Sequence, residues 1–105
     1  MKTAYILKKG NTFAISVPVQ MIKEGKAFVA FCPVLDLSTQ GNSFGQAQKM
    51  FDEIVRIFIE EIDRMGTMDK VLNDLGWRKN TSREWVPPER HFLGESTSHI
   101  NVCPT

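Results

Sequence analysis

The sequence predicts a single α+β domain, an antiparallel β-meander with one long and one short helix on one face. Residues 13–22 alternate between apolar and other side chains, which is typical of a strand with one buried face. Residues 43–65 carry apolar side chains at three- and four-residue spacing, as an amphipathic helix does. The length of 105 residues leaves room for one core. We expect the element order β-β-β-β-α-α-β across residues 1–105.

The first two strands are predicted near the N-terminus. Residues 3–7 favour a strand and Lys9-Gly10-Asn11 favours a turn, so residues 1–11 are expected to add an N-terminal strand and hairpin. Pro18 has no N–H to donate, which places the strand over residues 13–22 at a sheet edge or makes it locally irregular. The apolar face of that strand consists of Phe13, Ile15, Val17, Val19 and Met21.

Two further strands are predicted after the polar turn at residues 23–26. Residues 27–32 are almost wholly apolar, as in a strand covered on both faces, and Pro33 ends regular pairing. Residues 35–40 form a short alternating strand that Gly41 closes. Cys32 is expected to be a buried structural thiol, and Cys103 a second reduced cysteine.

The long helix is predicted to begin with a capping box, in which Ser43 and Gln46 satisfy free backbone N–H groups. Gly66 is its expected left-handed stop, and Gly76 ends a second, short helix in the same way. Trp77 then stands where a Schellman motif makes its apolar contact, with Leu72. The residues of the long helix expected to face the sheet are Ala47, Met50, Phe51, Ile54, Val55, Phe58, Ile62 and Met65.

The last part of the chain is predicted to be an irregular connection and a short strand. Residues 78–98 are polar and are interrupted by Pro87 and Pro88, which favours a connection without regular structure. Residues 99–103 have the pattern of a terminal strand that pairs back on the sheet.

No catalytic, metal or cofactor site is predicted. Asp36 is the one acidic residue in the strand region 27–41, and a single carboxylate cannot supply two-carboxylate or two-metal chemistry. A zinc site needs four ligands, which would have to come from His91, His99 and two distant cysteines. The glycine-containing turn before the long helix lacks the lysine of a phosphate-binding loop. We therefore expect a protein that is not an enzyme.

The charge is unevenly distributed along the chain. Residues 1–26 have a net charge of +4, from five lysines and one glutamate, whereas residues 27–65 have a net charge of −3. The acidic long helix argues against binding of nucleic acid on that face. The N-terminus has no signal-peptide pattern and no segment is apolar enough to cross a membrane, so we expect a cytoplasmic protein.

One region resembles a known family. Its pattern is a strand, a Cys-Pro corner, a Thr-Gln-Gly step and a helix with an early alanine, and the chain continues to a Leu-x-x-Leu-Gly-Trp ending at Trp77. This pattern, over about residues 12–88, is similar to the HicB-like antitoxins. The residues that carry this pattern are Gly25, Phe28-Val29-Ala30-Phe31-Cys32-Pro33, Leu35-Asp36-Leu37-Ser38-Thr39-Gln40-Gly41-Asn42-Ser43 and Ala47.

The resemblance implies a partial ribonuclease-H-like fold without nuclease carboxylates, and an antitoxin that binds and neutralises a small HicA-like, mRNA-cleaving toxin. Many members add a DNA-binding domain, but nothing after residue 77 has helical periodicity, so DNA binding is not expected. A basic toxin would complement the acidic surface formed by Asp36, Asp52, Glu53 and Glu60. The alternative is an orphan homo-oligomeric scaffold or small-ligand sensor with the same fold. Homo-oligomer formation is expected in either case.

Overall fold

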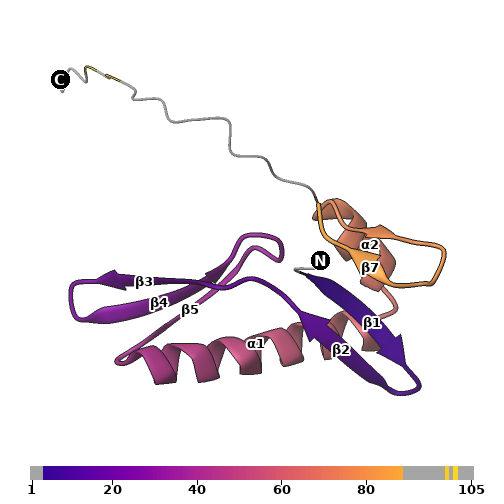
Figure 1. Cartoon of the computed structure of the whole chain (residues 1–105), viewed down its shortest axis with the longest axis horizontal. Helices are drawn as coiled ribbons and strands as arrows, with labels where there is room; N and C mark the ends of the chain where they lie inside the picture. Colours follow the sequence, from indigo (N-terminus) through magenta and orange to yellow (C-terminus); the bar gives the residue numbers. More distant parts are fainter. Residues whose placement is uncertain (1–3, 89–98, 100, 102–105) are drawn as a thin grey trace.

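The computed structural model describes residues 4–88, 99 and 101, and confirms an α+β architecture with two antiparallel sheets and two helices (Figure 1). One sheet has the strand order β2-β1-β7-β6, and the other has the order β3-β4-β5. The elements are β1 (Tyr5–Lys9), β2 (Thr12–Ser16), β3 (Gln20–Glu24), β4 (Ala27–Cys32), β5 (Leu37–Gly41), α1 (Phe44–Arg64), α2 (Met68–Asp74), β6 (Arg78–Lys79) and β7 (Trp85–Val86).

Two tight hairpins define the registers of the sheets. Lys9 pairs with Thr12 in the first, and Glu24 pairs with Ala27 in the second, so each loop has two residues. The first loop residue is Gly10 in one hairpin, with φ 61°, and Gly25 in the other, with φ 59°. The second loop residue, Asn11 or Lys26, does not have a positive φ, so both turns are of type II′, and glycine adopts the positive φ of the first position without strain.

The prediction of one strand over residues 13–22 is wrong. The segment divides into β2 and β3 at residues 17–19, around Pro18, and the two strands belong to different sheets. Proline cannot donate to a ladder, which explains why pairing stops there. The predicted apolar face is nevertheless kept, because all five of its side chains pack partly buried against the core. The division leaves β2 at the edge of its sheet.

The start of α1 and the C-terminal ends of both helices are as predicted. Ser43 Oγ accepts a hydrogen bond from the Gln46 N–H, 3.1 Å away. The Gln46 side chain accepts in return from the N–H of Asn42, one residue earlier than a standard capping box requires. Gly66 and Gly76, with φ 70° and 93°, form Schellman motifs, in which Thr67 N–H bonds to Ile62 O and Trp77 N–H bonds to Leu72 O.

The face of α1 that packs on the rest of the protein differs from the predicted stripe. Met50 and Met65 were expected in the core but are 45% and 59% exposed, whereas Ile59, which the prediction omitted, is buried. The apolar face of this helix is wider than the area that described residues cover, and spacing alone does not tell which flank is covered. The buried residues are Ala47, Phe51, Val55, Ile59 and Ile62.

The sheet β3-β4-β5 presents one face to α1. Thr39 Oγ1 donates to the Ala47 carbonyl at 3.0 Å, and a Cβ on Gly41 would come within 2.7 Å of the Ala47 nitrogen. Gly41 therefore allows β5 and the start of α1 to approach closely. Ala30 and Cys32 are buried on this face, which confirms the buried thiol. Cys103 lies outside the described residues.

The opposite face of β4 contradicts the expectation of cover on both sides. Val29 and Phe31 alternate with the buried Ala30 and Cys32, and both stay partly exposed. Ile22, which pairs with Val29 from β3, is also exposed.

The segment 78–98 is only partly the predicted irregular connection. β6 and β7 form a hairpin, and Trp85 of β7 pairs with Ile6 of β1. The Asn80 side chain accepts the N–H groups of Ser82 and Glu84 inside the hairpin loop, and so stabilises it. Residues 89–98 lie outside the described residues, as does the predicted strand 99–103 apart from His99 and Asn101, which are in no strand.

Trp77 connects the end of α2 to the corner that follows β4. Its indole N–H donates to the carbonyl oxygen of Val34 at 2.7 Å, across 43 positions of sequence. Trp77 is 1% exposed, and Leu35 and Leu72 are also fully buried. The bond satisfies both polar groups in an apolar environment, where leaving either one unpaired would be costly.

Substitution of Trp77 by phenylalanine should destabilise the protein by about 2–4 kcal/mol, because it removes the buried donor and leaves a cavity. Trp85→Phe is the matched control, since Trp85 is also buried but its indole N–H donates to no group in the described part of the chain. Urea unfolding of both variants measures the difference. Equal losses of stability would contradict the assigned role of the Val34 bond.

Phe51→Ala should cost about 3–5 kcal/mol, because Phe51 is 2% exposed and its loss leaves a cavity in the core. Met50→Ala, one residue earlier on the uncovered flank, should change the free energy of unfolding by less than about 0.5 kcal/mol. Thermal and urea unfolding of the two single variants distinguish these outcomes. A large loss for Met50→Ala would show that its flank is covered after all.

Candidate functional site

A groove with a volume of about 800 Å³ lies between β2 and α1. Its floor is apolar and comes from segments that are far apart in sequence. The division at Pro18 makes β2 an edge strand, so the side of β2 that faces away from β1 borders this groove. The apolar lining residues are Phe13, Ile15, Val17, Val19, Phe51, Val55 and Ile59.

The rim of the groove on α1 is mainly acidic. Four charged residues line it, at spacings of four, four and three, which places them along one side of the helix. Three are carboxylates and one is a guanidinium: Asp52, Arg56, Glu60 and Asp63. We call these four residues the acidic rim.

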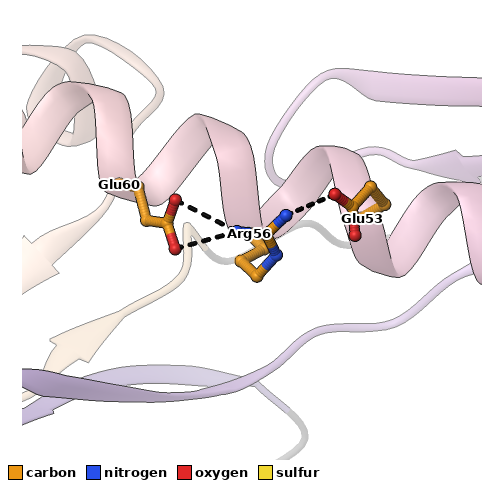
Figure 2. Close-up of polar contacts among 3 residues, drawn as sticks. All are labelled: Glu53, Arg56 and Glu60. Atoms are coloured by element: carbon orange, nitrogen blue, oxygen red, sulfur yellow. Dashed lines mark hydrogen bonds and ion pairs between the residues drawn. The ribbon is translucent and has the colours of Figure 1, made fainter.

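Arg56 is held between two carboxylates (Figure 2). Its guanidinium donates to both oxygens of Glu60, at 3.0 and 3.2 Å, and also bonds to Glu53. These hydrogen bonds raise the pKa of Arg56 above its ordinary value, and the bond to Glu53 contributes more than the bonds to Glu60. Arg56 therefore stays charged under all physiological conditions, and its single charge is shared by two acids.

The other two carboxylates of the acidic rim are less neutralised. Asp52 accepts a hydrogen bond from the neutral Gln48 amide at 3.0 Å and has no cationic partner in the ranges that the structure describes. Asp63 faces Lys8 of β1 at 3.6 Å, and both side chains are about half exposed. Such an exposed pair contributes little to stability and can exchange partners easily. The rim as a whole is therefore available to a cationic group.

The structure brings together two of the four predicted partner-binding residues. Asp52 and Glu60 line the groove, and Glu53 reaches the acidic rim only through Arg56. Asp36 lies in the turn between β4 and β5, with φ 55°, and does not line the groove. The prediction omitted Asp63 and the edge of β2. The position of Pro18 was the one sequence signal for that edge.

The described residues do not supply a metal site, since residues 4–88, 99 and 101 contain no group of three suitable His, Cys, Asp or Glu side chains. Over the same ranges, neither helix has the length and apolar character that a membrane crossing requires. Comparisons of the chain with protein-family models, curated proteins and solved structures find no match. The resemblance to HicB-like antitoxins therefore stays a prediction from the sequence pattern.

Proposed function

We propose that this chain is a non-enzymatic antitoxin, whose groove binds a small basic protein in the cytoplasm and neutralises it. The observation that carries the proposal is the combination of an apolar floor with an acidic rim on one groove. Burial of a partner's apolar side chains on the floor would supply affinity, and the rim would attract cationic groups and speed association.

The identity of the partner rests on the sequence resemblance. A HicA-like toxin that cleaves mRNA must present cationic groups to the phosphate backbone, because phosphate contacts dominate binding to nucleic acid. A carboxylate-rimmed groove is complementary to such a surface. Occupation of the cationic groups by the acidic rim would prevent the toxin from holding RNA. No catalytic step by the chain itself is needed.

The acidic rim can be tested with two neighbouring substitutions. Glu60→Lys reverses a charge on the rim, whereas Glu61→Lys makes the same change one residue later, outside the groove lining. Each glutamate forms an exposed ion pair within α1, Glu60 with Arg56 and Glu61 with Arg64, so the local losses are matched. The partner for the assay is a short basic protein, to be sought in the reading frames beside the gene.

Glu60→Lys should slow association with that protein about tenfold or more at low salt and weaken its salt dependence, while Glu61→Lys should change the rate little. Growth of cells that express the toxin should be restored by the wild-type chain. Stopped-flow kinetics and a growth assay measure the two effects. The proposal fails if no such neighbouring protein exists, or if both variants associate as fast as the wild type.

Self-association is the second candidate, because α1 leaves apolar side chains exposed on the flank away from the groove. Ile57 is 50% exposed there and lies between Met50 and Met65 in sequence. A homo-oligomeric scaffold would cover this flank. An exposed apolar patch of this kind is a common feature of subunit interfaces.

Light scattering should then give a mass of at least twice 11.9 kDa at micromolar concentrations. Ile57→Glu should reduce the mass to that of the monomer without changing the circular dichroism spectrum, because Ile57 contributes little to the core. A wild-type chain that is monomeric throughout the concentration series would exclude this second candidate.

A further inference from the structure

We infer that the element of the partner that enters the groove is an extended strand, which pairs with the free edge of β2. This inference rests on the proposed function, because it names the part of the basic partner that the groove binds. The strand would turn apolar side chains at alternate positions toward the floor, and its long basic side chains, which start on the opposite face, would bend over the outer edge of the strand to the acidic rim.

The backbone of β2 supplies the first argument. The two-residue loop makes Lys9 and Thr12 a hydrogen-bonded pair, and bonded and non-bonded pairs then alternate along the hairpin. Phe13 and Ile15 are in non-bonded pairs, so their N–H and C=O groups point away from β1, toward the open edge. No described residue bonds to these groups. Such an edge is a template for one more strand.

The dimensions of the groove agree with a strand. The five residues of β2 extend for about 17 Å at the rise of a strand. The part of α1 that lines the groove runs from Gln48 to Asp63, which is about 22 Å at the rise of a helix. An added strand of five to seven residues is therefore long enough to pair with the whole of β2 and to reach the rim.

A helix is a poorer occupant of the same space. It has no free N–H and C=O groups along its length, so it would cover the outward groups of Phe13 and Ile15 without bonding to them. Burial of unpaired backbone groups is unfavourable, because each group loses its hydrogen bonds to water without gaining another. A strand satisfies those groups and still places every second side chain on the apolar floor.

The charges favour a basic partner over a second copy of the chain. The strand β2 carries no charged residue, so it could pair with itself, but each copy would bring its own acidic rim toward the other. With three carboxylates and one guanidinium on each rim, like charges would meet. A strand with lysine or arginine side chains meets the opposite charge instead.

Three labelled peptides test the inference directly. The first is the heptapeptide Lys-Val-Lys-Ile-Lys-Val-Lys, which alternates apolar and basic residues. The second has the same composition with its apolar residues adjacent, Lys-Lys-Val-Ile-Val-Lys-Lys, and the third replaces every lysine of the first with glutamate. Fluorescence anisotropy measures binding to the full chain, and nuclear magnetic resonance measures exchange of the Phe13 and Ile15 amide protons.

The alternating lysine peptide should bind about tenfold more tightly than either control, because only it matches both the pleat and the rim. It should slow exchange at Phe13 and Ile15 while leaving Ala14, already bonded to β1, unchanged. Glu60→Lys should weaken this binding, and Glu61→Lys should not. Equal affinity of the three peptides, or unchanged exchange at Phe13 and Ile15, would overturn the inference.

The inference and the proposed function can fail separately. A chain that binds the alternating peptide through β2, but does not restore growth against the toxin, would keep the strand site and exclude the antitoxin role. A chain that neutralises the toxin while Phe13 and Ile15 continue to exchange freely would keep that role and exclude strand addition.

Discussion

The hydrogen bond from the Trp77 indole to the Val34 carbonyl is the contact on which the arrangement of the two sheets depends. No strand of one sheet pairs with a strand of the other. Val34 belongs to the corner after β4, whereas Trp77 leads directly into β6, whose partner β7 pairs with β1 (Figure 1). The bond therefore joins the corner after β4 to the start of β6, while α1 packs on β4 and β5 and lines the groove beside β2. The groove needs both connections, because β2 and α1 form its two walls.

The features that the sequence predicts well are those with causes close together in the chain. Ser43, Gly66 and Gly76 act within about one helical turn of their partners, so each cap can be recognised from a short segment, whereas the bond from the Trp77 indole to Val34 crosses 43 positions and no local pattern shows it. Pro18 is less informative, because the absence of an N–H permits either an edge strand or a break. The structure shows that both apply here: β2 is an edge strand, and it ends two residues before the proline.

The features that the sequence does not predict depend on contacts between distant segments. The apolar face of α1 is too wide for spacing to show that Ile59 is covered and Met50 is not. The groove forms between residues 12–19 and residues 48–63, and no local pattern brings them together. The acidic charge of residues 27–65 indicated Asp36, Asp52 and Glu60 alike. It could not separate Asp36 from the other two, because the net charge of a segment does not show which side chains face the same surface.

The proposed binding of a basic partner in the groove between β2 and α1 can be located on the chain itself. Hydrogen exchange of the chain in complex with the full-length basic partner, resolved to single amides, tests it most directly. Slowed exchange is expected in β2, at the positions that face away from β1, and unchanged exchange in β3 and β4. Protection confined to the outer face of β3 and β4, with β2 unchanged, would contradict it.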